Sequence, residues 1–195
     1  MAVAAPPIIE TPIARLPDVV GRLREKFGEA MSAVYEFRGE TTITVTRDAL
    51  VDVARFLRDE FHFEELVDVT ALDWDISAKD APVRYAETLQ GGEERELIES
   101  RPRFEVLFSF LSISNQARLR LRVPLGESDT RVPSLTSEYA GANFFEREVF
   151  DLMGISFVGH PFMHRILMPD NWVGYPLRKD NPLGYEPVDD AERFR

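Results

Sequence analysis

Residues 104–123 read FEVLFSFLSISNQARLRLRV, and this stretch decides the fold class. Its first ten residues form a strongly apolar run, which is typical of a strand at the centre of a sheet. A turn at 114–116 follows. From Arg118 to Val123 arginine alternates strictly with leucine or valine, which predicts a half-buried antiparallel strand. Its arginine face could bind an acidic partner, but a solvated face is the more common arrangement.

Around this hairpin, apolar spacing predicts three helices and several further strands. The helices are expected over 17–30, from a cap at Thr46 to about residue 60, and over 143–153, where Phe145, Val149 and Leu152 face the core and Gly154 ends the helix. Strands are expected over 31–37, 41–46, 63–74 and 155–157. The order α-β-β-α-β-β-β-α predicts an α+β domain, with helices packed on a largely antiparallel or mixed sheet.

The chain is expected to have three parts: a loose N-terminal tail (1–16), the α+β domain (17–158) and an extended, irregular C-terminal tail (159–195). Residues 154–195 contain nine of the 24 Gly and Pro residues. Such a proline-aromatic stretch makes few local backbone bonds, so it gains order by lying along another surface. That surface is either a partner or the chain's own domain. Residues 77–100 are polar and acidic, and we expect a surface excursion with a short strand at 83–88.

Composition excludes several kinds of function. The formal net charge is −11, of which −10 falls on residues 1–100, and such acidity disfavours nucleic acid. The chain has no cysteine, so it can form neither a disulfide nor a cysteine-ligated iron–sulfur cluster. It contains no glycine-rich nucleotide loop and no apolar run of the ~18 residues that span a bilayer. The N-terminus lacks the basic region of a signal peptide.

Two chemical alternatives remain open in the C-terminal half. His160 and His164 could share a zinc ion with a carboxylate, as in a small hydrolase, but Pro161 disfavours the helical turn that such a pair needs. Glu148 and Asp151 lie three residues apart on the predicted helix and could do acid–base work if buried. A helix face paired with arginines, such as Arg147 or the cluster at 178–179, is the more ordinary arrangement.

Residues 144–183, FFEREVFDLMGISFVGHPFMHRILMPDNWVGYPLRKDNPL, resemble the signature of the 30 kDa subunit of respiratory complex I. In bacteria this is the C-type subunit of NADH–quinone oxidoreductase. The matching pattern is E-R-E-x-x-D-[LM]-x-G-I-x-F-x-G-H-P-x-[LM]-x-R-I-L, followed by G-x-P-L-R-K-D. Clear resemblance covers about residues 130–184.

The resemblance implies a non-catalytic scaffold subunit of the peripheral arm, at the cytoplasmic face of the membrane and attached only through the complex. It implies no catalytic, cofactor-binding or metal-binding residue on this chain, since FMN, iron–sulfur clusters and quinone belong to partner subunits. The expected partners are the 49 kDa-type quinone-site subunit, also called the D-type subunit, and other peripheral-arm subunits. A related membrane-bound hydrogenase or a ferredoxin- or coenzyme-linked dehydrogenase is the alternative. The interface residues expected from the motif are Glu146, Arg147, Glu148, Asp151, Gly159, His160, Pro161, Arg165, Gly174, Pro176, Leu177, Arg178, Lys179 and Asp180.

Within this set, Arg178 and Lys179 are expected to make charge-assisted contacts with the partner or with Asp180. Gly159, Gly174 and Pro176 are expected to set the path of the tail. We therefore expect Arg178→Ala to loosen assembly while the isolated domain stays folded.

Overall fold

The computed structural model describes residues 16–37, 39–75 and 101–181. Most of the predicted N-terminal tail, the excursion at 77–100 with its short strand, and the last part of the C-terminal tail lie outside these residues. Within them, no helix is long and apolar enough to cross a membrane.

A five-stranded mixed sheet forms the centre of the molecule, in the order β1-β2-β5-β4-β3. Its strands are β1 (Met31–Phe37), β2 (Glu40–Val45), β3 (Glu65–Asp73), β4 (Phe104–Ser112) and β5 (Ala117–Leu125). β2 and β5 run parallel, and all other neighbours in this sheet are antiparallel. The quoted hairpin is thus the β4–β5 pair at the centre. The predicted α+β class with helices on a mixed sheet is confirmed.

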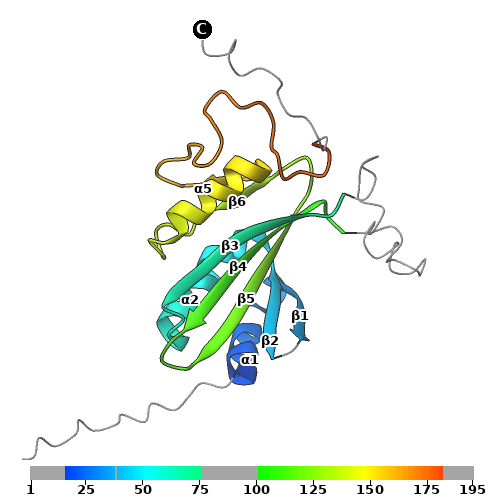
Figure 1. Cartoon of the computed structure of the whole chain (residues 1–195). Coiled ribbons are helices and arrows are strands. Elements are labelled where there is room, and N and C mark those ends of the chain that lie inside the picture. The colour runs from blue at the N-terminus through cyan, green and yellow to red at the C-terminus, as the bar shows by residue number, and fades with distance from the viewer. Residues whose placement is uncertain (1–15, 38, 76–100, 182–195) are drawn as a thin grey trace, which may run out of the picture.

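Two helices, α1 (Leu16–Phe27) and α2 (Leu50–Phe61), cover one face of the sheet (Figure 1). The core lies between these helices and the sheet, where alternate residues of β4 and β5 such as Phe108 and Leu121 are fully buried. Two short 3₁₀ turns, Gly28–Ala30 and Arg47–Ala49, were not predicted. The second corrects the expected helix start: Thr46 precedes this turn, its side chain makes no capping hydrogen bond, and α2 begins at Leu50.

The third helix, α5 (Ala142–Met153), packs along β3, and beside it β6 (Arg131–Pro133) pairs in parallel with β7 (Ser156–Val158). Gly154 ends α5 with a φ of +70°, as predicted. The predicted core stripe is confirmed at Val149, which is buried, and at Phe145, which packs half-buried against the core, but Leu152 is only half-buried and does not belong to it. Instead α5 buries residues on two sides, since it lies between the sheet and the C-terminal residues (Figure 1).

Candidate functional site

Residues 159–181, here called the C-terminal segment, run without regular structure along the outer side of α5 (Figure 1). This is the part of the motif for which sequence left two alternatives, a partner's surface or the chain's own domain. In the structure the segment lies on its own domain and is held there by specific polar contacts. Those contacts begin at the last turns of α5.

Asp151 is the first anchor, and its side chain is completely buried. Oδ2 accepts hydrogen bonds from three successive backbone N–H groups, those of Ile166 (2.9 Å), Leu167 (2.7 Å) and Met168 (2.8 Å). Oδ1 accepts one from the Arg165 guanidinium at 2.7 Å. Burial raises the pKa of Asp151, but these hydrogen bonds outweigh it, and the net pKa is lower than usual. Asp151 is therefore an ionised carboxylate that fixes the backbone of the segment.

Arg165 extends this anchor across the segment. Nη1 also donates to the Asp151 carbonyl at 3.0 Å, and Nη2 donates to the carbonyls of Trp172 (3.1 Å) and Gly174 (3.2 Å). Arg147 of α5 holds the start of the same turn by donating to the carbonyls of His164 and Arg165. The two guanidinium groups thus satisfy carbonyls that have no partner in a helix or sheet.

Arg178 closes the end of α5. Its Nε donates to the Met153 carbonyl at 2.7 Å, and Nη2 donates to the Gly154 carbonyl at 3.3 Å. The guanidinium lies over the rings of Tyr175, at 4.5 Å, and Phe104, at 5.1 Å. A cation placed on the last carbonyls of a helix also complements the helix dipole. A Cβ at Gly154 would lie 2.5 Å from both the Arg178 guanidinium and the Tyr175 ring, so this close packing requires glycine.

A cluster centred on Arg103 holds the last described residues. Asp73, at the end of β3, accepts from Arg103 (3.2 Å) and from the Lys179 backbone N–H (2.9 Å). Arg103 also pairs with Asp180, at 2.7 Å, and with Glu127. Burial lowers the pKa of Arg103, but hydrogen bonds to these carboxylates outweigh it and raise the pKa. Asp180 therefore pairs with Arg103, not with Arg178 as one of our expectations had it.

Glu146 is the second buried carboxylate of α5, on its other side. It is 0% exposed and accepts from Ser134 Oγ at 2.6 Å and from the Leu135 N–H at 2.7 Å. Burial raises the pKa of Glu146 to about 7, against the opposing effect of these two hydrogen bonds. Its role in the structure is to tie α5 to the turn that follows β6.

The structure does not bring together the alternative catalytic groups. Glu148 is exposed, whereas Asp151 is buried with both oxygens bound to other groups, so the two do not form an acid–base pair. His160 engages both ring nitrogens, with Nε2 at 3.2 Å from the Asn143 carbonyl and Nδ1 accepting from the Phe162 N–H. The His164 ring stacks on Phe162 at 4.2 Å. Within the part of the chain that the structure describes, no three His, Cys, Asp or Glu residues are grouped to hold a metal.

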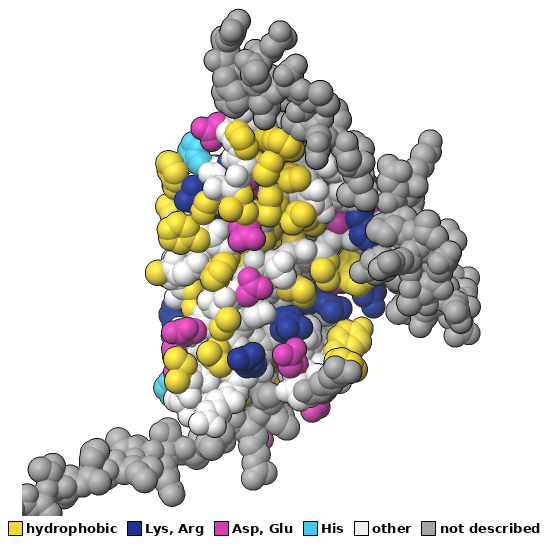
Figure 2. Space-filling view, in the orientation of Figure 1, with side chains coloured by type: hydrophobic (Ala, Val, Ile, Leu, Met, Phe, Trp, Pro, Cys, Tyr) yellow, Lys and Arg dark blue, Asp and Glu magenta, His cyan; other side chains and the backbone are white. Residues whose placement is uncertain are grey.

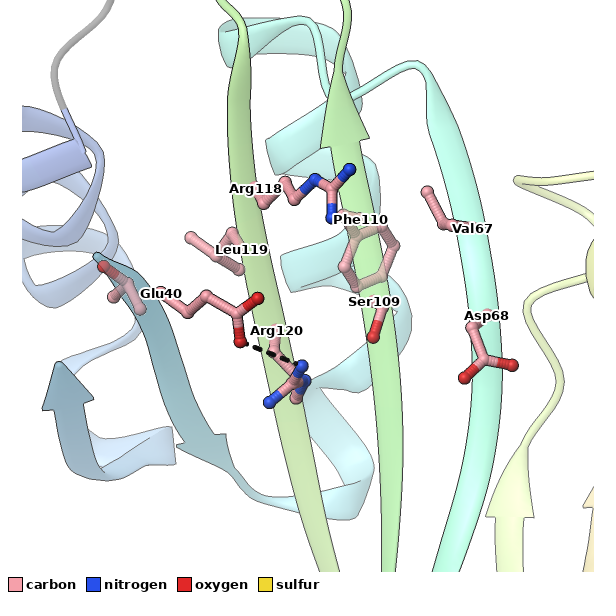
Figure 3. A pocket seen from close by; sticks show the side chains of 9 residues that line it. Glu40, Val67, Asp68, Ser109, Phe110, Arg118, Leu119 and Arg120 are labelled. Carbon is pink, nitrogen blue, oxygen red and sulfur yellow. Dashed lines mark hydrogen bonds and ion pairs between the residues drawn. The ribbon is translucent and has the colours of Figure 1, made fainter. Parts of the chain in front are cut away.

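The arginine row of β5 is largely paired within its own sheet. Arg120 pairs with Glu40 at 3.2 Å, and Arg122 pairs with Glu105 at 3.5 Å, while Arg118 is exposed. Figure 3 shows the first of these pairs beside a hollow of about 160 Å³. This agrees with a face that is solvated and internally neutralised.

Apolar side chains are exposed on the outer side of α5 and the C-terminal segment. Figure 2 shows hydrophobic side chains gathered over α5 and the C-terminal segment. Within the segment the most exposed large apolar side chains are Val173 (85% exposed), Leu167 (60%), Leu177 (59%) and Phe162 (57%). Phe144 of α5 and Val158 of β7 are also exposed. Exposed apolar side chains that gather on one face mark an interaction site.

The predicted site residues differ in their surroundings. The charged ones, Glu148 apart, together with His160, make contacts within the chain through their side chains or, for Lys179, through the backbone N–H, whereas Leu177 is exposed. Gly159 and Gly174 each have a φ of +89°, a conformation that favours glycine. Sequence reasoning missed Asp73 and Arg103, which flank residues 76–100 and carry no motif. That these residues form an interface with a partner stays a prediction.

Comparison with known proteins identifies the family. Residues 43–187 match the family described as "Respiratory-chain NADH dehydrogenase, 30 Kd subunit". The chain belongs to this family. The resemblance inferred from the motif is confirmed. Family members named as the C-type subunit of NADH-quinone oxidoreductase include one from Geobacter sulfurreducens, 40% identical over 83% of this chain and 86% of the relative, and one from Roseiflexus castenholzii, 40% identical over 88% and 87%.

A third family member, from Aeromonas salmonicida, is named as a joint C/D subunit of NADH-quinone oxidoreductase. It is 40% identical over 84% of this chain, but that region is only 25% of the relative. Two solved structures share the fold. A trypsin-resistant fragment of Nqo5 has a TM-score of 0.56 at 24% identity and covers 74% of this chain and 98% of the fragment. A chain of an archaeal membrane-bound sulfane sulfur reductase has a TM-score of 0.58 at 19% identity, over 86% and 85%.

Proposed function

We propose that this chain is the 30 kDa, C-type subunit of an NADH–quinone oxidoreductase, acting as a non-catalytic scaffold in the peripheral arm of complex I. Family membership and relatives of 40% identity over most of both chains support this assignment. FMN, iron–sulfur clusters and quinone would then be held by other subunits. The chain would lie at the cytoplasmic face of the membrane and reach it only through the complex.

The expected neighbour is the D-type, quinone-site subunit. The observation that carries this choice is the Aeromonas relative, whose name joins C and D and of which this chain matches one quarter. Two functions that occur in one polypeptide are held close together by covalent connection. On this chain, the segment with exposed apolar side chains over α5 offers the surface for such a neighbour.

A tagged full-length chain, purified from gently solubilised membranes, tests the proposal. Mass spectrometry should find a D-type polypeptide and cluster-bearing subunits at a fixed ratio to the tagged chain. The co-purifying electron-input subunit would also decide between NADH and another donor, as in the related hydrogenases and dehydrogenases. Recovery of the chain alone, with the tag accessible, would overturn the scaffold role.

A further inference from the structure

Three charged side chains of the motif, those of Asp151, Arg165 and Arg178, bind the chain's own backbone and side chains. Asp151 is fully buried and engages both carboxylate oxygens with the chain itself. The Arg165 guanidinium contacts three carbonyls and one carboxylate of the chain, and Arg178 contacts two carbonyls and two aromatic rings. Arg165 thus donates to four oxygens and has little hydrogen-bonding capacity left for a partner, while the Arg178 guanidinium is turned toward the end of α5 and two aromatic rings. These three residues are here called the clamp.

The large apolar side chains of the same segment remain exposed, beside polar ones such as Asp170 and Asn171. Leu167 and Leu177 each donate their backbone N–H inward, to Asp151 and to the Leu152 carbonyl, while 60% and 59% of each residue stays exposed. Val173 lies between the two carbonyls that Arg165 binds and is 85% exposed. The clamp therefore fixes the backbone at the residues that carry the exposed side chains. Leu167, Val173 and Leu177 are here called the apolar ridge.

We infer that the clamp does not contact the partner but holds the segment in shape, and that the partner contacts the apolar ridge. This inference rests on the proposed function, because the occupant it commits to is the D-type polypeptide joined to the C portion in the Aeromonas relative. Such a partner should present an apolar strip, since the ridge side chains that would face it are apolar. Desolvated apolar anchors carry most of the binding energy at interfaces of this kind.

Three variants of the full-length chain separate the two roles. A double variant, Val173→Ser with Leu177→Ser, removes two of the three apolar side chains of the ridge and leaves the clamp residues unchanged. Arg178→Lys weakens the clamp, because an ammonium cannot reproduce the planar contacts of a guanidinium. Ile113→Ser is the matched control, because Ile113 is an apolar residue that is 58% exposed. It follows the far end of β4 from Phe104, the residue that Arg178 contacts, and lies about 30 Å from it at the rise of ~3.3 Å per residue.

Two measurements are made on each variant. The first is the amount of D-type polypeptide that co-purifies from membranes, and the second is amide hydrogen exchange of residues 166–178 in the chain alone. The ridge variant should lose about tenfold or more in co-purified partner, while its exchange stays like wild type. Arg178→Lys should raise exchange at residues 177 and 178 about tenfold or more. Ile113→Ser should change neither.

Two results would overturn the inference. One is normal partner recovery with the ridge variant. The other is loss of partner in Arg178→Lys with unchanged exchange, which would place Arg178 in the interface itself. If the wild-type chain recovers no D-type polypeptide, the proposed function and the ridge both fail, but the exchange data still decide the clamp.

Discussion

Replacing Asp151 by asparagine should detach the C-terminal segment from α5. Asparagine has the same shape but one oxygen and one NH₂ in place of two oxygens. In the structure one carboxylate oxygen faces three backbone N–H groups and the other faces the Arg165 guanidinium. Whichever way the amide is turned, its NH₂ faces donors and leaves at least one buried donor without an acceptor.

The cost follows from the number and kind of bonds lost. Hydrogen bonds to a charged group contribute about 1.5–3 kcal/mol each, and breaking a buried pair by removing one partner costs about 3–5 kcal/mol. Because Asp151 and Arg165 share one network, these contributions are not additive. We expect the free energy of unfolding to fall by roughly 3–5 kcal/mol, a large part of the ~5–15 kcal/mol of a typical domain.

Urea unfolding of the full chain at pH 7 measures this loss, and hydrogen exchange at residues 166–168 locates it. Glu148→Gln is the matched control, since Glu148 is an exposed acid of the same helix, and surface changes usually stay within about 0.5 kcal/mol. A loss below about 1 kcal/mol, with protection at 166–168 unchanged, would refute the anchor assigned to Asp151.

The dependence of the unfolding free energy on acid pH gives a second test of the Asp151 carboxylate. Hydrogen bonding lowers its pKa in the folded state despite burial, so the stability that it contributes is present above the unfolded pKa. That contribution is lost as pH falls through the folded pKa. The asparagine variant should therefore lose less stability on acidification than the wild type.

Three further changes test other parts of the region. Burial raises the pKa of Glu146 to about 7 from an ordinary 4.5, so its contribution is full below about pH 4.5 and is lost as pH rises through 7. In urea titrations at a series of pH values, Glu146→Gln should therefore reduce the fall in unfolding free energy over this range by up to about 3 kcal/mol. If the unfolding free energies of variant and wild type stay parallel as pH changes, the raised pKa of Glu146 is contradicted. Gly154→Ala should lower the melting temperature more than Gly159→Ala, because both have positive φ but only residue 154 meets a side chain; equal shifts would show that the contact with Arg178 and Tyr175 is unimportant. Asp73→Asn should speed tryptic cleavage after Arg178 several-fold, since the Lys179 N–H and Arg103 lose a charged acceptor; an unchanged rate would contradict this anchor.

Local periodicity was enough to predict the three helices and every described strand except the short β6, but it predicted neither the two 3₁₀ turns nor the non-local strand pairing. The alternation from Arg118 to Val123 identifies a half-buried strand whatever it pairs with, and it gave the β4–β5 hairpin correctly. The parallel pairing of β2 with β5 brings together residues almost 80 positions apart, and no local pattern specifies it. The same limit applies to Thr46, where a good capping residue precedes a 3₁₀ turn instead of the helix.

For the site, sequence predicted which residues matter better than what they do. On an amphipathic helix, E-R-E-x-x-D indicates carboxylates on the surface. Helical spacing cannot show that a loop about 15 residues later places three backbone N–H groups over Asp151 and buries it. Arg178 has no regular structure around it, which suggested a contact with another protein. Within the chain its hydrogen bonds go to the carbonyls at the end of α5, which need a donor there, and a contact with a partner stays a prediction.

The internal anchoring would also explain how an irregular segment could serve as the proposed docking surface. Fixing the backbone of one residue costs about 1–2 kcal/mol, so ordering ten residues only on binding would consume most of the energy that a few apolar side chains supply. Asp151 and Arg165 order residues 165–174 before any partner arrives, through bonds that are internal to the chain. A buried ion pair adds little net stability by itself, but it defines one geometry. The polar contacts beneath the segment therefore offset the entropic cost of ordering it within the chain. The apolar side chains above it then remain available for association.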